Sequence, residues 1–196
     1  MLIYGAGGHA RVVASILSAC GEFISGVFDD NWVAIPPSVH RILGRYVSNS
    51  MEAENLIIAI GNNHDRRRVA AGISHLFGKA IHPTASIEPS VSIGLGTVII
   101  HRAVVQAGSY LGCHVIVNTG AIIDHDCVLA DFAHIGPGAT LCGGVHVGEC
   151  TLVGAGSVIL PQVSIGKECV IGAGTVVVSD VPDFTTVVGN PARMVH

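Results

Sequence analysis

The chain has 196 residues, of which 49% are hydrophobic and 12% are charged, and its formal net charge is -4. No apolar run approaches the roughly eighteen residues that a membrane-spanning helix needs, and the scarcity of basic residues argues against nucleic acid as a partner. With no leader pattern before the first strand, we expect a cytoplasmic protein that neither enters a membrane nor binds nucleic acid.

Residues 1–80 alternate short apolar strands with helical patterns, which indicates a small parallel sheet of βαβ units. The pattern predicts strands over 1–4, 23–28 and 56–60, and helices over 9–20 and about 63–77. Asn62 or Asn63 is expected to cap the second helix, and Ile35–Pro37 marks a loop. The three arginines at 66–68 are expected to lie on one solvated helix face.

A glycine cluster, YGAGGHARV, lies between the first strand and the first helix. Gly5, Gly7 and Ala10 match the pattern G-x-G-x-x-[GA], and Asp29 and Asp30 follow the second strand, as in dinucleotide-binding sites. The residues before the repeat region hold one mononucleotide-binding half and one further βα unit, whereas a nicotinamide site needs two such halves. The pattern therefore predicts a phosphate site at a helix N-terminus.

Residues 81–182 follow a strict period of six, from IHPTAS to VVSDVP, over seventeen consecutive hexads. Every first position is Ile, Leu or Val, and every fifth is Ala, Ser, Thr, Cys or Val. A helix gives a period of 3.6 and a simple strand a period of two, so this period predicts a solenoid of parallel strands with both positions facing inward. Tyr110 and Phe132 are the only aromatic residues in the hexads, as a narrow interior requires.

These hexads resemble those of the hexapeptide-repeat acyltransferases, which fold as left-handed parallel β-helices with three hexads in each triangular coil. The resemblance implies that residues eighteen apart stack between coils. The expected fold is a Rossmann-like α/β nucleotide-sugar-binding domain over 1–80 followed by a left-handed parallel β-helix over 81–182. Residues 183–196 would cap the solenoid and contact coenzyme A.

Three acids crowd around one histidine in the stretch IIDHDCVLAD, where Asp124, Asp126 and Asp131 surround His125. His125 occupies a third hexad position, which should face outward, and an imidazole is suited to take and return a proton near neutral pH. Stacking places Gly143 one coil away, where its backbone N–H is positioned to stabilise an oxyanion. A surface histidine stabilised by flanking acids is the structural alternative.

The segment NTGAIIDHDCVLADFAHIGPGA resembles the active-site stretch of acetyltransferases that modify amino sugars on nucleotide carriers, a branch that includes bacillosamine-pathway, perosamine and sialic acid acetyltransferases. The resemblance implies that His125 is the general base, that Asp126 orients it, and that Asn118 lies near the sugar. It also implies that His134 contacts acetyl-coenzyme A, with packing of His134 against the coil as the alternative.

In the same branch the N-terminal domain holds the diphosphate of a nucleotide sugar. The residues that the resemblance places at this substrate site are Gly5, Gly7, Gly8, His9, Asp29, Asp30, Gly61 and Asn62. The structural alternatives are a polar helix-start residue for His9 and a strand-to-helix turn for Gly61 and Asn62. The tail VVGNPARMV resembles the V-x-G-x-P-A-[RK] ending of these enzymes, which implies that Gly189, Pro191 and Arg193 contact coenzyme A. A turn that protects the last edge strand is a compatible alternative.

Metal and disulfide chemistry are not expected. The six cysteines include no C-x-x-C pair, so buried free thiols are the expected state. The γ-class carbonic anhydrases bind zinc through three histidines on this kind of fold. Here no two hexad histidines are eighteen, thirty-six or five residues apart, so convergent zinc ligands are not expected.

The expected function is acetyl-coenzyme A-dependent N-acetylation of a nucleotide-linked amino sugar, UDP-linked and aminated at C4, by direct attack with His125 as base. The family resemblance also implies a homotrimer with acetyl-coenzyme A between neighbouring solenoids. Two alternatives remain open, namely O-acetylation of sialic acid or a polysaccharide, and a non-catalytic nucleotide-binding scaffold.

Overall fold

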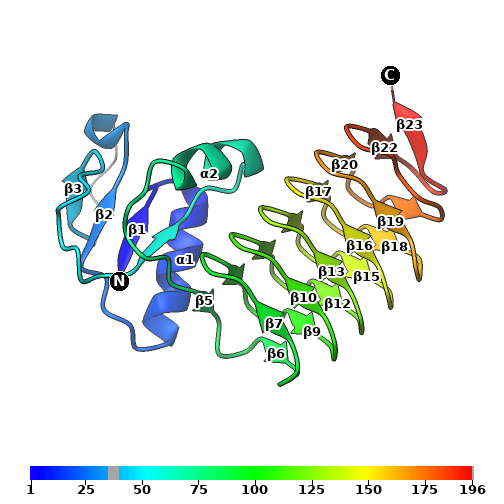
Figure 1. Ribbon diagram of the computed structural model, residues 1–196, viewed down its shortest axis with the longest axis horizontal. Coiled ribbons are helices and arrows are strands. Elements are labelled where there is room, and N and C mark those ends of the chain that lie inside the picture. The colour runs from blue at the N-terminus through cyan, green and yellow to red at the C-terminus, as the bar shows by residue number, and fades with distance from the viewer. Residues whose placement is uncertain (35–39, 196) are drawn as a thin grey trace.

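The computed structural model describes residues 1–34 and 40–195. An N-terminal parallel sheet with two helices lies beside one end of a long solenoid of short strands, which continues to the C-terminus (Figure 1). The loop expected at Ile35–Pro37 lies outside the described residues. Within the described ranges, no helix is long and apolar enough to cross a membrane.

The N-terminal sheet confirms the βαβ prediction. Its four parallel strands lie in the order β3-β2-β1-β4. The elements are β1 (Leu2–Tyr4), α1 (Gly8–Ala19), β2 (Gly26–Phe28), a 3-10 turn η1 (Trp32–Ala34), β3 (Ile42–Gly44), β4 (Leu56–Ile58) and α2 (Asn63–Ala70). The edge strand β3 was not predicted, because its residues are only half-buried and carry a weak apolar pattern.

Helix α2 is shorter than the sequence predicted. Asn62 caps it, because its side-chain oxygen accepts a hydrogen bond from the Asp65 backbone N–H at 3.0 Å. The helix ends at Ala70, and the chain then runs beside β4, where Leu56 forms a parallel bridge with Phe77. Ile73 and Phe77, which suggested further helical turns, pack against the sheet instead.

The arginines of α2 do not all lie on a solvated face, so that expectation is wrong. Arg66 is 1% exposed and is among the largest fully buried side chains. Arg67 reaches two solenoid carboxylates, and Arg68 pairs with a carboxylate on its own helix. The solenoid covers one side of α2, and the pattern of a single helix does not reveal such a neighbour.

The solenoid has three walls, and the strands of the hexads that pair within a wall are parallel and eighteen residues apart, as Ile122 and Thr140 are. Sheet 1 contains β5 (Ala80–Ile81), β8 (Val98–Ile99), β11 (Ile116–Val117), β14 (His134–Ile135), β17 (Leu152–Val153), β20 (Val170–Ile171), β22 (Thr186–Val188) and β23 (Arg193–Val195). Sheet 2 contains β6 (Ser86–Ile87), β9 (Val104–Val105), β12 (Ile122–Ile123), β15 (Thr140–Leu141), β18 (Val158–Ile159) and β21 (Val176–Val177). Sheet 3 contains β7 (Ser92–Ile93), β10 (Tyr110–Leu111), β13 (Val128–Leu129), β16 (His146–Val147) and β19 (Ser164–Ile165).

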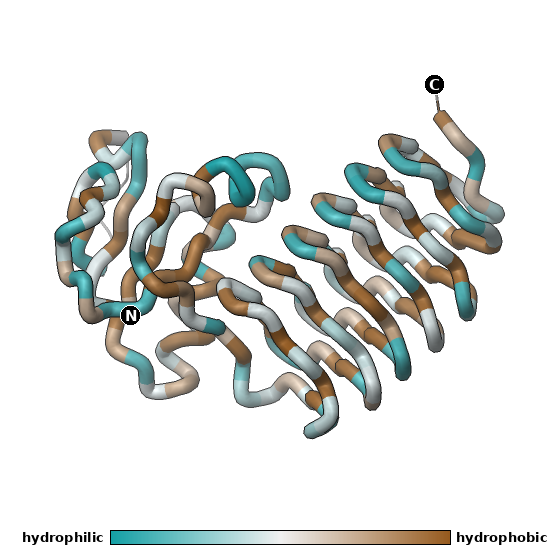
Figure 2. The backbone as a smooth tube through the Cα atoms, viewed as in Figure 1, coloured by the Kyte–Doolittle hydropathy of each residue, from teal (hydrophilic) through white to brown (hydrophobic). Residues whose placement is uncertain are grey.

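The six-residue period determines which side chains face inward. The second residue of each solenoid strand is the first hexad position, and Ile123, Leu129 and Ile135 there are fully buried. The fifth positions, such as Ala121 and Cys127, are also buried, as the sequence predicted. Figure 2 shows the resulting alternation of apolar and polar residues along every coil.

The end of the solenoid is closed by the C-terminal tail. Strand β22 extends sheet 1 beside β20, and β23 returns antiparallel to β22. Gly189 has a left-handed backbone with φ of 97°, and its N–H donates to the Thr175 hydroxyl at 3.2 Å. The tail therefore covers the edge of the last coil in sheet 1.

Sheet 1 is the wall on which the N-terminal unit docks. Ala10, Val13 and Leu17 of α1 form one apolar cluster with Val98 and Ile116 of the solenoid. Each of these five side chains is at least nine-tenths buried. This apolar contact places the loops of the N-terminal sheet beside the middle coils of sheet 1.

Replacing Ile171 by Ala should lower the free energy of unfolding by about 2–5 kcal/mol, because a buried side chain is removed from the narrow interior. Val170 precedes it on β20 but faces outward and is 40% exposed, so Val170→Ala should cost less than about 1 kcal/mol. Urea unfolding followed by circular dichroism at one protein concentration measures both. Equal losses would contradict the inward register.

Candidate functional site

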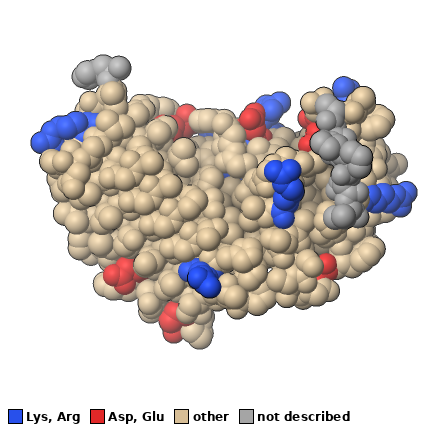
Figure 3. Space-filling view, turned by 180° about the vertical axis from the view of Figure 1, so that it is seen from behind, with Lys and Arg blue, Asp and Glu red and all other residues tan. Residues whose placement is uncertain are grey.

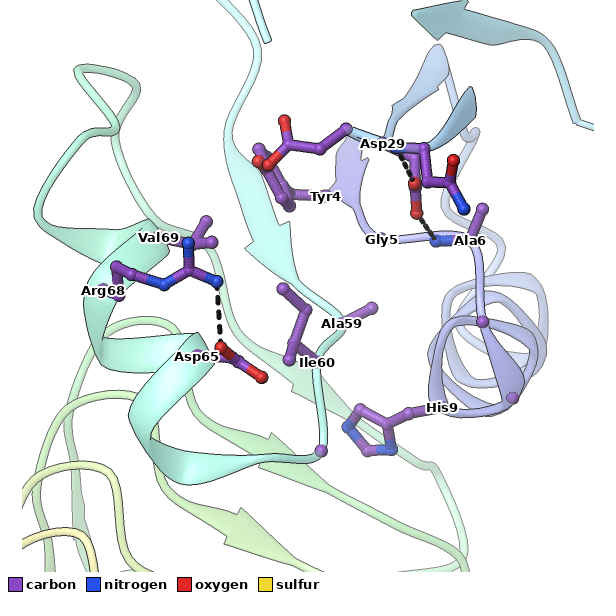
Figure 4. Close-up of a pocket in the computed structure, with 15 residues that line it drawn as sticks. Tyr4, Gly5, Ala6, His9, Asp29, Ala59, Ile60, Asp65, Arg68 and Val69 are labelled. Atoms are coloured by element: carbon purple, nitrogen blue, oxygen red, sulfur yellow. Dashed lines mark hydrogen bonds and ion pairs between the residues drawn. The ribbon is translucent and has the colours of Figure 1, made fainter. Parts of the chain in front are cut away.

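An open pocket of about 350 Å³ lies at the carboxyl ends of β1, β2 and β4 (Figure 4). The strand order reverses between β1 and β4, which is where parallel α/β sheets bind ligands. The sequence-predicted residues that line it are Gly5, Gly7, Gly8, His9, Asp29, Asp30 and Gly61. Asn62 does not line the pocket but caps α2 beside Gly61.

The N-terminus of α1 faces this pocket. Gly7 is its N-cap and makes no side-chain capping bond, so the first N–H groups of the helix have no intrahelical acceptor. Gly5 has φ of 106°, and a Cβ there would lie 3.0 Å from the Ala59 carbonyl oxygen, so glycine lets the two loops approach closely. The geometry suits an anion such as a phosphate.

Asp29 is held in place on the opposite wall. One carboxylate oxygen accepts a hydrogen bond from the Ala6 N–H at 2.8 Å, and the other accepts one from the Asn31 N–H at 2.7 Å. Asp30 lies beside Tyr4, where burial and this carboxylate together raise the pKa of the phenol to about 12.

Three pocket residues, Asp65, Arg68 and Val69, come from α2 and were missed from the sequence. Asp65 and Arg68 form an ion pair at 2.9 Å and line the pocket together (Figure 4). They are three residues apart and therefore share one helix face. That spacing, directly after a strand and the turn IGNN, was the available signal.

A polar cluster joins the loop that contains Ile60 and Gly61, the pocket loop, to sheet 1. His134 Nδ1 lies 3.2 Å from the Gly61 carbonyl oxygen, and its Nε2 lies 3.1 Å from the Asn118 side-chain nitrogen. The Asn118 side-chain oxygen accepts the Thr119 N–H at 2.8 Å, so its amide nitrogen is the donor to Nε2. This network assigns the proton of neutral His134 to Nδ1, from which it is donated to Gly61.

Three histidines surround the buried guanidinium of Arg66. Burial, reinforced by the charge of Arg66, lowers the pKa of His9, His114 and His134 to about 4 in each case. Among the described residues, His9 Nε2 and His114 Nδ1 are buried without a hydrogen-bond partner. These imidazoles are therefore neutral at physiological pH.

His125 has the opposite environment. It lies at the corner between β12 and β13, where its Nδ1 is 2.8 Å from Asp126 Oδ2, and its side chain is 59% exposed. The bond to Asp126, followed by the charge of Asp124, raises the pKa of His125. With Nδ1–H donating to Asp126, Nε2 keeps its lone pair and can accept a proton.

The stacking expected between His125 and Gly143 is confirmed. A Cβ on Gly143 would lie 2.5 Å from His125 Nε2, so the ring occupies space that only glycine leaves open. Among the described residues, no acceptor takes the Gly143 backbone N–H. A proton acceptor and a backbone donor therefore lie side by side at this corner.

One copy of the chain does not bring all the predicted site residues together. The pocket is lined by residues of the N-terminal unit, and His134 of sheet 1, which is bonded to Asn118, contacts the carbonyl of the lining residue Gly61. His125 lies at the corner between sheets 2 and 3 instead. Gly189, Pro191 and Arg193 lie at the last coil, where Arg193 is exposed.

The part of the chain that the structure describes contains no cluster of metal-ligating side chains. No group of three or more His, Cys, Asp or Glu side chains there is placed to hold an ion. All six cysteines are free thiols. Cys20 is exposed, contrary to the expectation of burial, whereas Cys127, Cys150 and Cys169 are buried.

Comparison with protein families gives two matches. Residues 1–73 match the model described as the PglD N-terminal domain. Residues 144–179 match the model described as bacterial transferase hexapeptide (six repeats).

Solved structures match the whole chain. PerB from Caulobacter crescentus, in complex with CoA and GDP-perosamine, is 37% identical with a TM-score of 0.94, covering 100% of this chain and 96% of that one. The acetyltransferase domain of PglB from Neisseria gonorrhoeae FA1090 is 40% identical with a TM-score of 0.91, covering 99% and 98%.

A curated relative matches over a shorter length. UDP-N-acetylbacillosamine N-acetyltransferase from Bacillus subtilis (strain 168) is 36% identical over 113 residues, which are 50% of this chain and 50% of the relative. The match therefore spans half the length of that relative.

The neutral histidines predict how stability depends on pH. The unfolded chain binds these protons near the ordinary histidine pKa of 6.5, whereas the folded chain binds them near 4. The free energy of unfolding should therefore be greatest above pH 6.5 and fall between pH 6.5 and 4.

Urea unfolding across this pH range measures the slope. Replacing His114 by Asn, which tolerates its left-handed φ of 56°, removes one such proton site. The slope should then fall by up to about 1.4 kcal/mol per pH unit. An unchanged slope would contradict the neutral, buried state of His114.

Proposed function

The chain belongs to the left-handed β-helix acyltransferase family, and on that premise we propose that it transfers the acetyl group of acetyl-coenzyme A to the amino group of a nucleotide-linked amino sugar. The observation that carries the proposal is the presence of two features in one chain. One is a pocket suited to a phosphate, at the point where the strand order of the N-terminal sheet reverses, and the other is an outward-facing His125–Asp126 pair on a hexapeptide solenoid. Neither feature alone selects this reaction.

The pocket supports a nucleotide diphosphate as the carrier. In the proposed complex, the N–H groups at the start of α1 bind the diphosphate, and Gly5, Gly7 and Gly8 let it approach the backbone. Asp29 and Asp30 lie at the edge that would contact the ribose or base. The PerB structure was solved with CoA and GDP-perosamine, which supports both ligand classes.

The acceptor is proposed to be the amine at C4 of a UDP-linked sugar. This choice follows the resemblance to bacillosamine-type enzymes and the curated relative that acts as a UDP-N-acetylbacillosamine N-acetyltransferase. His9 and Asn118 would lie near the sugar, and Gly61 and Asn62 would hold the loop beneath it.

The chemical step is direct attack. The amine nitrogen forms a bond to the thioester carbonyl carbon while His125 Nε2 accepts the amine proton. Asp126 holds Nδ1–H and stabilises the imidazolium that results. The carbonyl oxygen becomes an oxyanion that the Gly143 N–H stabilises. The carbonyl then reforms as the carbon–sulfur bond breaks, and the leaving coenzyme A sulfur takes the proton held by the His125 imidazolium.

Acetyl-coenzyme A is proposed to extend along the solenoid from Gly143 towards the tail. The exposed Arg193 guanidinium would pair with a phosphate of the nucleotide end, beside Gly189 and Pro191. Both ring nitrogens of His134 are bonded within the chain, so its contact with acetyl-coenzyme A would be made by packing.

A second copy of the chain would complete the site. Apolar side chains flank the His125 corner on both walls, with Ile122 41% exposed on sheet 2 and Tyr110 49% exposed on sheet 3. The solenoid face seen in Figure 3 carries few charges. A contact between this corner and the next copy's pocket is heterologous, and such contacts form a ring when the rotation between copies closes. We propose the three-membered ring that the family resemblance implies.

Thiol release from acetyl-coenzyme A in the presence of UDP-, GDP- and CMP-linked amino sugars tests this function. Replacing His125 by Ala should lower kcat by about 10²–10⁴-fold and leave the KM for the sugar nearly unchanged, because only the proton acceptor is lost. Steady-state kinetics at saturating acetyl-coenzyme A measures both constants.

His146→Ala is the matched control, since His146 lies outward on sheet 3 and should leave kcat unchanged. An unchanged kcat in His125→Ala would remove the base from the proposal. Release of thiol only with hydroxyl acceptors would indicate the O-acetyltransferase. No acetyl-coenzyme A binding at all would indicate a scaffold.

A further inference from the structure

Arg66 is a buried cation whose hydrogen-bonding capacity is fully used. Its guanidinium carries five N–H donors, and five oxygen acceptors lie between 2.8 and 3.1 Å. The side chain is 1% exposed. Such saturation fixes the guanidinium in one orientation.

The acceptors belong to two parts of the molecule. Ile60 and Gly61 contribute carbonyl oxygens from the pocket loop, and His114 and Phe132 contribute carbonyl oxygens from successive coil corners. The fifth acceptor is Asn63 Oδ1. Arg66 therefore clamps the pocket loop directly onto the solenoid.

Asn63 extends the clamp to a third coil. Its side-chain nitrogen donates to the Cys150 carbonyl oxygen at 2.9 Å, one coil beyond Phe132. Asn63 is 7% exposed. These contacts fix the position of the pocket loop along the solenoid axis and also its distance from the solenoid wall.

The charge of Arg66 has no carboxylate partner among the described residues. Its two neighbours differ in this respect, because Arg67 bonds Glu149 and Glu168 and Arg68 bonds Asp65. Burial lowers the pKa of Arg66 to about 10, which still leaves it charged at neutral pH. A buried cation held only by neutral oxygens is costly, so stability alone is a poor reason for its presence.

Gly61 links this clamp to the substrate side. Its carbonyl oxygen accepts from Arg66 Nη1 at 3.1 Å and also from His134 Nδ1 at 3.2 Å. His134 Nε2 in turn accepts from the Asn118 amide. We infer that Arg66 is a positioning residue: by fixing the Gly61 carbonyl, it holds His134 in its Nδ1–H tautomer and thereby orients Asn118 beside the nucleotide pocket.

The positive charge of Arg66 also favours the neutral form of His134 over the doubly protonated form. His134 is faced by His9 from α1, by Arg66 from α2 and by the amide of Asn118, and none of these groups favours a second proton. A protonated His134 would present N–H to the Asn118 amide nitrogen, which is also a donor. The amide would have to rotate and lose its bond from the Thr119 N–H.

Arg66→Lys tests the inference, because lysine keeps the charge but cannot supply five donors in a planar fork. Arg67→Lys is the matched control on the same helix, where an exposed ion pair is altered instead. Imidazole ¹⁵N shifts report the tautomer of His134 in wild type and both variants. Kinetics report KM for the nucleotide sugar and for acetyl-coenzyme A.

The wild type should show His134 as the Nδ1–H tautomer. Arg66→Lys should mix the tautomers and raise KM for the nucleotide sugar about tenfold, with KM for acetyl-coenzyme A unchanged, while Arg67→Lys changes neither. The inference would be overturned if Arg66→Lys lowered stability but left both the His134 tautomer and the ratio of the two KM values, for the nucleotide sugar and for acetyl-coenzyme A, unchanged.

The tautomer measurement still tests the inference when the Arg66→Lys variant does not fold or when the protein lacks the proposed activity. An Nε2–H tautomer of His134 in the wild type overturns the inference without any variant, including the case in which Arg66→Lys does not fold. The kinetic part rests on the proposed function, whereas the tautomer does not. Loss of the function alone would therefore leave the tautomer test standing.

Discussion

The docking of the N-terminal unit on sheet 1 determines which solenoid residues can approach the pocket at the start of α1. Apolar side chains of α1 supply the contact area against Val98 and Ile116, and Arg66 supplies its register through carbonyl oxygens of two coil corners. Burial of apolar surface is not directional, whereas a saturated guanidinium is. Asn118 and His134 consequently lie beside the pocket loop, and His125 lies on the far side of the coil.

The candidate site residues include histidines in two kinds of environment. His125 is exposed beside two carboxylates, which raise its pKa and suit it to accept a proton. His9 and His134 are buried beside Arg66, which helps to keep them neutral. The separation in space matches the division of labour that we propose, with one base for the transfer step and two uncharged rings at the substrate pocket.

Sequence reasoning succeeded where a residue's environment is set by its own segment. The hexad positions of Ile123 and Cys127 predicted their burial. The glycines before α1 line a pocket, and the phosphate that they predict there stays a prediction. Sequence reasoning failed where a distant segment decides. The sequence predicts a solvated helix position for Arg66, but the solenoid covers this side chain. Helix α2 ends at Ala70 because apolar residues that follow it pack on β4. The separation of His125 from the pocket follows from the docking geometry, which no motif encodes.

The most direct test of the account is subunit complementation between two inactive variants. His125→Ala removes the base, and Gly8→Asp places a carboxylate where the diphosphate would bind, at a helix start that accepts aspartate readily. Each variant alone should release thiol from acetyl-coenzyme A far more slowly than the wild type with the sugar substrate. Mixed and exchanged subunits should regain activity, because some sites then combine an intact pocket with an intact His125 from a neighbour. Mixed subunits that exchange yet remain inactive would contradict a site shared between two copies.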